Sequence, residues 1–385
     1  MYLLKNATVF SVARPPFVGD VLIEGKTIRE VGEAILCPGA QTLDATGLYA
    51  MPGIVDAHDH IGMWEDGIQV EGDDGNEMSD PCTPELRAID AINPFDRCFK
   101  EAREGGITTC VTGPGSANVL GGQFAALKTW GSGVDAMLIK APIAMKAALG
   151  ENPKSVYSGQ KAAPQTRMAT AAILRRALLE AQAYALKLQA EEESDKPEFD
   201  MVKEAMLPVL SRELPLKIHA HRADDILTAL RIAKEFNLRI TLDHCTEGHL
   251  IPEHIKAAAE AGAGIILGPL LTDRSKVELR NQTFAAPRLL HEAGVEFALM
   301  SDHPVIPVQY LPVVAALAVR DGLPEEIALK AITLHAARAV GLSARIGSLE
   351  PGKDADIAVF SAHPFSYLAK CVLTLIDGTI VHDAR

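Results

Sequence analysis

The middle of this 385-residue chain alternates between short apolar strands and helical stretches, and this alternation constrains the fold more than any other feature. The expected strands are Ile54–Ala57, Ile107–Thr112, Met137–Ala141, Leu216–His219, Arg239–Leu242, Gly264–Leu267 and Val295–Met300. The helical stretches between them include Ala169–Glu192, Ala223–Glu235, Pro252–Ala261 and Ala286–Ala293. Strand–helix alternation over this length favours a parallel sheet closed into a (β/α)8 TIM barrel, here a distorted one spanning residues 53–345.

Both ends of the chain are rich in short strands instead. Leu3–Val9, Val21–Glu24, Thr27–Val31 and Gln41–Asp44 are apolar or β-branched, and Gly25-Lys26 separates two of them like a hairpin turn. Near the other end, Asp356–Phe360, Val372–Ile376 and Thr379–His382 follow the same pattern, and Asp377-Gly378 is a strong hairpin signal. We therefore expect residues 1–52 and 346–385 to form one small β-sandwich domain together.

Composition excludes several classes of protein. Hydrophobic residues make up 48% and charged residues 23%, which are globular values, and the net charge of −13 argues against a nucleic-acid partner or docking on anionic lipid. No apolar run is long enough to span a bilayer, the first residues lack a signal-peptide pattern, and the six cysteines are scattered. We expect a cytoplasmic protein with a small-molecule partner, and the oligomeric state stays open, a homo-oligomer being one alternative.

Two segments between the expected elements have the character of loops. Residues Met63–Asp96 are acidic and poor in apolar residues, and a loop of this length is either a functional lid or a mobile surface loop. Gly113–Gly122 is glycine-rich but lacks the G-x-G-x-x-G spacing of a nucleotide site, so it is expected to be a loop on the substrate side.

Histidines gather at the predicted carboxyl ends of strands. His58 and His60 end the first barrel strand, where residues i and i+2 face the same side and can converge on one cation. An H-x-H pair alone is weak evidence, because two such histidines also cap strands with hydrogen bonds. However, His219, His244 and Asp302 end or follow three further strands in the same sense. Imidazole and carboxylate are the usual ligands of Zn²⁺, so the sequence predicts a metal site.

Two motifs resemble a known family. Pro52-Gly53-Ile54-Val55-Asp56-Ala57-His58-Asp59-His60 resembles the opening signature of the metal-dependent amidohydrolase superfamily, and Gly347–Asp356 resembles its closing signature. The segments Ile218–Ile226 and Ala148–Pro153 are similar to the imidazolonepropionase-related branch.

The resemblance implies a divalent metal, most simply Zn²⁺, as one ion or two. It implies that His58, His60, His219 and Asp302 are ligands, and that His244 is either a ligand of a second ion or a catalytic histidine that touches the substrate. His221 falls where the family places a polar group outside the ligand shell, and His219 is favoured over it as the ligand. Two-metal members carry a carboxylated lysine on the fourth strand. Lys140 is the candidate, and Lys146 and Lys128 compete with it.

The resulting expectation is a hydrolase that cleaves a C–N bond of an amide or cyclic amide with a metal-activated water. Asp302 is expected to take the proton from that water, and His244 to help stabilise the oxyanion. A heterocycle deaminase and a dipeptidase are alternatives that use the same site, and a non-catalytic scaffold is a third. Cys245 is expected to be a packed thiol, His249 and His254 to lie at the surface, and His303 to support Asp302.

Overall fold

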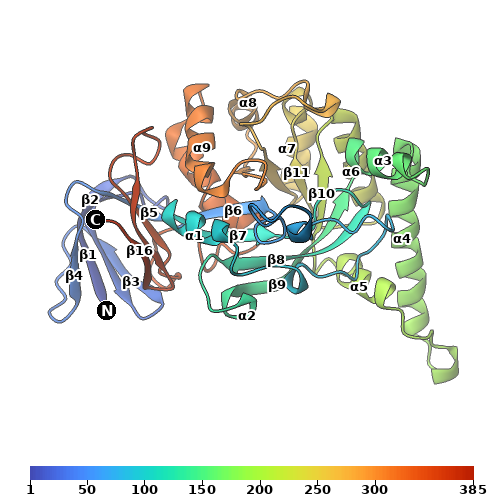
Figure 1. Ribbon diagram of the computed structural model, residues 1–385, viewed down its shortest axis with the longest axis horizontal. Coiled ribbons are helices and arrows are strands. Elements are labelled where there is room, and N and C mark those ends of the chain that lie inside the picture. The colour runs from blue at the N-terminus through green and yellow to red at the C-terminus, as the bar shows by residue number, and fades with distance from the viewer.

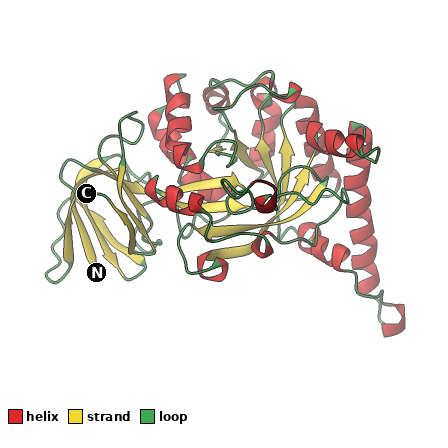
Figure 2. Ribbon diagram, viewed as in Figure 1, coloured by secondary structure: helices red, strands yellow, loops and turns green.

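The computed structural model describes residues 1–385 and divides the strands into two sheets (Figures 1 and 2). The first sheet joins the two ends of the chain, since β5 pairs with both β1 and β14. Its strands are β1 (Tyr2–Val9), β2 (Phe17–Glu24), β3 (Thr27–Gly32), β4 (Gln41–Asp44), β5 (Tyr49–Pro52), β14 (Ile357–Phe360), β15 (Cys371–Ile376) and β16 (Thr379–Asp383). This sheet surrounds its own apolar core, which includes Leu4, Ile23, Val359 and Leu375. The predicted terminal β-domain is confirmed.

The second sheet is a nearly closed eight-stranded barrel in the order β13-β12-β11-β10-β9-β8-β7-β6. Its strands are β6 (Ile54–Asp59), β7 (Ile107–Thr112), β8 (Leu120–Lys128), β9 (Leu138–Ala148), β10 (Leu216–Ala220), β11 (Ile240–His244), β12 (Gly264–Leu267) and β13 (Ala298–Leu299). Backbone hydrogen bonds from His60 N to His303 O (2.9 Å) and from Asp302 N to His58 O (3.3 Å) join the first and last strands at the site end of the barrel.

Helices cover the outside of the barrel (Figure 2). They are α1 (Arg97–Glu104), α2 (Val134–Met137), α3 (Glu151–Gly159), α4 (Arg167–Leu188), α5 (Met201–Leu210), α6 (Ala223–Glu235), α7 (Pro252–Glu260), α8 (Ala286–Glu292), α9 (Leu311–Arg320), α10 (Glu325–Ala331) and α11 (Leu334–Ala339). Helix α6 shows why they form. It buries Ile226, Ala229 and Ile232 at helical spacing, and most of its charged residues lie outside this face, Asp225 being the buried exception. No helix combines the length and the apolarity needed to cross a bilayer.

The distortion of the barrel lies in β7, β8 and β9, which form an antiparallel meander in an otherwise parallel sheet. Strand β8 was not predicted, because Gly121, Gly122 and the alanines that follow have low strand propensity and conceal it. The predicted strand Met137–Ala141 is only the first part of β9, and Met137 itself ends α2. Counted from β6, β9 is the fourth strand of the barrel, a point that matters for the lysines below.

Candidate functional site

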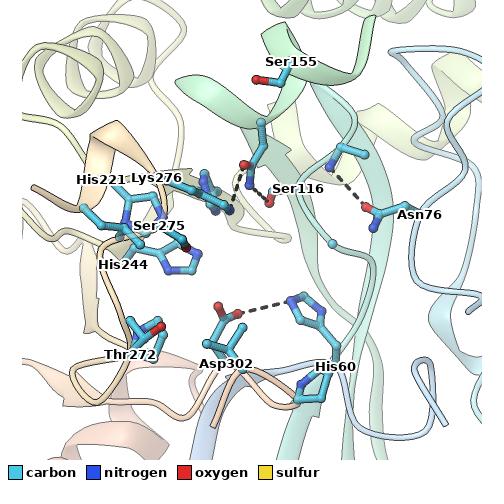
Figure 3. A pocket seen from close by; sticks show the side chains of 18 of the residues that line it. His60, Asn76, Ser116, Ser155, His221, His244, Thr272, Ser275, Lys276 and Asp302 are labelled. Atoms are coloured by element: carbon cyan, nitrogen blue, oxygen red, sulfur yellow. Dashed lines mark hydrogen bonds and ion pairs between the residues drawn. The ribbon is translucent and has the colours of Figure 1, made fainter. Parts of the chain in front are cut away.

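A cavity of about 450 Å³ opens at the carboxyl ends of the barrel strands (Figure 3). The long loop at residues 63–96 forms one wall with Trp64, Asn76 and Met78, and the loop at 113–119 contributes Gly115 and Ser116. The loop at 113–119 thus lies on the substrate side, as expected, and the long loop, for which a lid or a mobile surface loop was expected, also lines the cavity. His60, His219, His221, His244 and Asp302 lie on its floor and sides.

His58 at the end of β6 and His60 just after it are each held with one ring nitrogen free. His58 Nδ1 donates to Asp243 Oδ2 at 2.8 Å, and His60 Nδ1 donates to the Gly113 carbonyl at 2.6 Å. Their Nε2 atoms lie 3.5 and 3.3 Å from Asp302 Oδ1. Because a hydrogen bond fixes the Nδ1 atom of each ring, both Nε2 lone pairs point at the small volume that the carboxylate also faces. A hydrogen bond on the second ring nitrogen is the usual support of a metal-bound imidazole.

Asp243 was not among the predicted site residues, although it precedes His244 directly. Besides His58, it accepts hydrogen bonds from Lys217 Nζ at 3.2 Å and from Thr241 Oγ1 at 2.9 Å. Burial acts to raise the pKa of this carboxyl, but Lys217 and His58 hold it below its ordinary value. A charged residue inside an otherwise apolar strand was the signal that could have revealed it.

Asp302 sits in a strained position after β13. Its φ is +56°, in the left-handed region that non-glycine residues seldom adopt. Asp56 holds the preceding residue, because its carboxylate accepts hydrogen bonds from both the backbone N–H and the hydroxyl of Ser301. Burial acts to raise the pKa of Asp302, but the neighbouring imidazoles of His244, His58 and His60 keep it well below the usual range. The group is thus an anion that faces the cavity.

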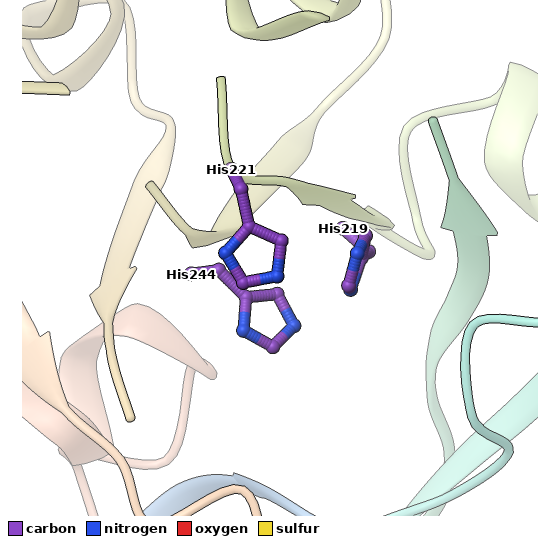
Figure 4. A group of neighbouring side chains, drawn as sticks. All are labelled: His219, His221 and His244. Atoms are coloured by element: carbon purple, nitrogen blue, oxygen red, sulfur yellow. The ribbon is translucent and has the colours of Figure 1, made fainter. Parts of the chain in front are cut away.

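Three histidines form a second group at the ends of β10 and β11 (Figure 4). Ring centroids are 4.2 Å apart for His219 and His244, 4.3 Å for His221 and His244, and 4.7 Å for His219 and His221. His244 Nδ1 donates to the Gly268 carbonyl at 2.9 Å, and His221 Nδ1 lies 2.7 Å from Thr246 Oγ1. Neither ring nitrogen of His219 has a hydrogen-bond partner. His221 was predicted only as a supporting residue outside the ligand shell, but the structure places it in the same cluster of rings as His219.

The lysine prediction needs correction. Lys140 is exposed on the outer half of β9, six residues or about 20 Å of strand from Lys146, so it cannot bridge ions at this site. Lys146, on the same fourth strand, is fully buried, and its Nζ has no hydrogen-bond partner. Burial lowers the pKa of this ammonium to about 8. Lys128 lies elsewhere, paired with Asp354 and Asp356. The predicted strand Met137–Ala141 ended too early, so Lys146 fell outside it although both lysines lie on β9.

The other secondary predictions can also be compared with the structure. Cys245 is fully buried, and burial raises the pKa of its thiol to about 12, as expected for a packed side chain. His254 is exposed and His249 half-buried. His303 is buried directly beside Asp302, and its Nδ1 accepts a hydrogen bond from Val308 N at 3.3 Å.

The residues present fit a divalent cation. Burial, reinforced by the charge of Lys146, lowers the pKa of His58 to about 4 and that of His219 well below the usual value. Burial also lowers the pKa of His244. These imidazoles are neutral at pH 7, which is the form that binds metals. His58, His244 and Asp302 each offer a ligand atom within 4.8 Å of the others, and so do His219, His221 and His244.

Comparison with known proteins supports the same interpretation of the site. The model of the amidohydrolase family matches residues 49–381. The chain belongs to the amidohydrolase family. A solved amidohydrolase from Thermotoga maritima MSB8 is 43% identical, covers 100% of both chains and superposes with a TM-score of 0.96. Amidohydrolases act on C–N bonds with a metal, and that much of the predicted chemistry is confirmed.

Among curated members of the amidohydrolase family, amidohydrolase tasK of Hapsidospora irregularis is 30% identical over 398 residues, or 95% of this chain. The chain spans only 40% of the length of that relative. An imidazolonepropionase from Cupriavidus necator is 33% identical over 175 residues, which cover 44% of this chain and 40% of that protein. The predicted resemblance to the imidazolonepropionase-related branch is confirmed.

Proposed function

We propose that this amidohydrolase cleaves the C–N bond of a small amide or cyclic amide with water activated by a divalent metal, most simply Zn²⁺. The observation that carries the proposal is the convergence of His58 Nε2 and His60 Nε2 on one oxygen of Asp302, at 3.5 and 3.3 Å. Two imidazoles and a carboxylate in this arrangement are a metal-ligand set, and His219 is the fourth ligand we propose. In the alternative with two ions and a carboxylated bridging lysine, Lys146 would be that lysine.

The chain's own residues then divide the work. A cation held by these ligands supplies a Lewis acid that lowers the pKa of water from about 15.7 toward about 7. Asp302, ionised and facing the cavity, accepts the proton of the attacking water and returns it to the leaving nitrogen. His244 also lines the cavity, and because its Nδ1 donates to the Gly268 carbonyl, its Nε2 presents a lone pair to the substrate or to a cation.

The cavity lining indicates what else the substrate carries. Lys276 is the single lysine or arginine among the lining residues, and it makes no ion pair with a carboxylate. Its Nζ is held by Asn152 Oδ1 at 2.9 Å, and Asn152 Nδ2 donates to Ser116 Oγ at 2.6 Å. An ammonium held this way at the edge of the cavity favours a substrate with an anionic group, such as a carboxylate.

The experiment is a screen of zinc-reconstituted protein against hydantoins, imidazolones, dihydropyrimidines, lactams and dipeptides, each with and without a carboxylate. Ring opening, or cleavage of a non-peptide amide without ammonia, supports the proposal. Release of ammonia from a heterocycle identifies a deaminase, and activity confined to dipeptides identifies a dipeptidase. A protein that takes up no metal after chelation and reconstitution is a scaffold, and the proposal then fails. The six unpaired cysteines favour a reducing compartment, so we propose a cytoplasmic enzyme.

A further inference from the structure

One buried lysine lies beneath the site without reaching the cavity. Lys217 belongs to β10 and is only 1% exposed, and its side chain leaves the strand on the same side as that of His219, two positions later. Lys217 is not among the residues that line the cavity. Its ammonium is therefore out of reach of a substrate, and any part that it takes in the reaction must act through a neighbouring group.

The ammonium of Lys217 makes two polar contacts inside the barrel. Nζ donates to Asp243 Oδ1 at 3.2 Å, and the other oxygen of Asp243 accepts the Nδ1–H of His58 at 2.8 Å. Nζ also donates to the carbonyl of Ala57, the residue before His58, at 3.0 Å. Since β10 and β6 lie on opposite sides of the barrel, this side chain crosses the interior. It reaches His58 by two routes, one through the ring and one through the backbone.

The backbone contact falls on an irregular part of β6. The register between β6 and β7 shifts between Asp56 and Asp59, where β6 has one residue more than its partner. Such a β-bulge re-aims a side chain next to a site and locally disrupts the ladder. Side chains hold this bulge instead. The Asp56 carboxylate accepts a hydrogen bond from His58 N at 3.2 Å, and Lys217 holds the Ala57 carbonyl.

The surroundings of the ammonium favour this arrangement over others. The ring centroid of Phe124 lies 5.5 Å from Lys217 Nζ and 5.4 Å from the centroid of the His58 ring. An ammonium gains energy beside an aromatic face, which also keeps water away. Besides Lys217 and His58, Asp243 is bonded only by the Thr241 hydroxyl at 2.9 Å. A buried carboxylate without a cation is costly, so Lys217 stabilises Asp243 as the acceptor for His58.

We propose that Lys217 is a positioning residue for the metal ligand His58. The inference rests on the proposed function, because it requires that His58 Nε2 binds the cation. Through Asp243, Lys217 keeps Nδ1 as the donor of the ring, so the lone pair lies on Nε2. Through Ala57, it fixes the direction in which this lone pair points. Without the ammonium, the carboxylate and the bulge both lose a contact, and Nε2 shifts with them.

The zinc affinity of the whole protein tests the proposal without a substrate. Chelated protein is titrated with Zn²⁺ against a competing chelator, and the affinity of each bound equivalent is determined. His58→Asn identifies the equivalent that depends on His58. Lys217→Met should weaken that equivalent by about 10–100-fold, the usual effect of losing an outer partner of a metal ligand. With Co²⁺ in place of Zn²⁺, the visible absorption of Lys217→Met should also differ from that of the wild type, because these bands report ligand geometry.

The matched control is Lys128→Met. It also removes a buried lysine that is paired with carboxylates, but at the junction of the barrel and the β-domain. We expect Lys128→Met to lower stability while the zinc affinity and the cobalt spectrum stay those of the wild type. A double-variant cycle adds a second test. Because Lys217 acts partly through Asp243, Lys217→Met combined with Asp243→Asn should lose less affinity than the product of the two single losses.

Three results would overturn the proposal. They are a folded Lys217→Met with the affinity and spectrum of the wild type, an equal weakening in Lys128→Met, and independent effects in the cycle. If Lys217→Met fails to fold by circular dichroism, Lys217→Gln takes its place with the same direction of change. A wild type that binds no zinc would refute the proposed function itself. A zinc-binding wild type whose ion is lost in His58→Asn but unaffected in Lys217→Met would leave the proposed function intact.

Discussion

Two groups of buried charge in this protein use the same kinds of side chain, and they differ in how well their polar atoms are paired. At the junction of the barrel and the β-domain, Lys128 Nζ lies 2.9 Å from Asp354, 3.3 Å from Asp377 and closer still to Asp356. At the barrel mouth, buried atoms of Lys146, His58, His219 and Glu278 have no partner at all. Burial alone does not distinguish the two regions.

The difference separates a structural role from a functional one. Buried charged groups in stable proteins are usually paired, because burying an unpaired charge costs free energy. Unpaired atoms that persist in one small volume indicate a ligand that pairs them when it binds. The junction thus pairs its charges within the chain, whereas the mouth of the barrel leaves polar atoms that a ligand could pair.

The largest expected effect comes from removing one carboxylate from each region. Asp302→Asn should fold normally and lower kcat by at least about 10²–10⁴-fold, because proton transfer by a positioned base contributes that much. Asp356→Asn should leave kcat unchanged and lower the free energy of unfolding. The measurements are turnover of the substrate found in the screen, metal content and thermal denaturation of both variants. An active, metal-loaded Asp302→Asn enzyme would assign the proton to another residue.

Next come the two lysines, compared in metal-free protein. Lys128→Met leaves the buried Asp356 and two partly buried carboxylates without their cation and should lower the free energy of unfolding by about 3–5 kcal/mol. Lys146→Met removes an ammonium without a partner and should leave stability unchanged or raise it. Urea unfolding with the slope checked for two-state behaviour measures both. If Lys128→Met and Lys146→Met lowered the free energy of unfolding equally, the paired and the unpaired lysine would not differ in their effect on stability, and the comparison would fail.

These regions also show which parts of the site could be predicted from the sequence. Strands that end in His58, His60, His219 and Asp302 could be predicted, because apolar runs end there and the carboxyl ends of barrel strands meet at one edge. Glu278, whose Oε1 lies 3.7 Å from His221 Nε2, could not be predicted, since it follows a strand by eleven positions in a segment without periodicity and reaches His221 only through the folded loop. Lys146 and Lys140 stand on one strand, and only the strand's full length shows which of them is buried.

A smaller effect is expected from pH in metal-free protein. Burial lowers the pKa of His58 and His303 to about 4 and of His221 to about 3, against about 6.5 unfolded. The unfolded chain therefore binds protons first, and this stability is present above pH 6.5 and lost as pH falls toward 4. Burial of Asp59 raises its pKa to about 6 and opposes the trend.

For His58 alone, the loss between pH 6.5 and 5 is about 2 kcal/mol. Denaturation of chelated protein across this range should show the decline, and His58→Asn should flatten it by about that amount. At the junction, burial raises the pKa of Asp356 and Lys128 opposes this effect, so Lys128→Met should raise that pKa further and make stability rise, not fall, as pH decreases. A slope that is insensitive to His58→Asn would contradict the assignment of the pH effect to the barrel mouth.

The smallest effect concerns Lys276, which is exposed at the rim and therefore partly screened by water. A single charge-assisted hydrogen bond to a substrate anion is worth about 1.4 kcal/mol, or tenfold in affinity. Lys276→Met should therefore raise KM about tenfold for the carboxylate substrate, leave kcat nearly unchanged, and have no effect on the matched substrate that lacks the carboxylate. Lys140→Met is the control, because Lys140 is also an exposed lysine but lies on the outer half of β9. It should change neither KM nor metal content. If Lys276→Met impaired both substrates equally, the lysine would support the loop through Asn152 rather than contact the anion.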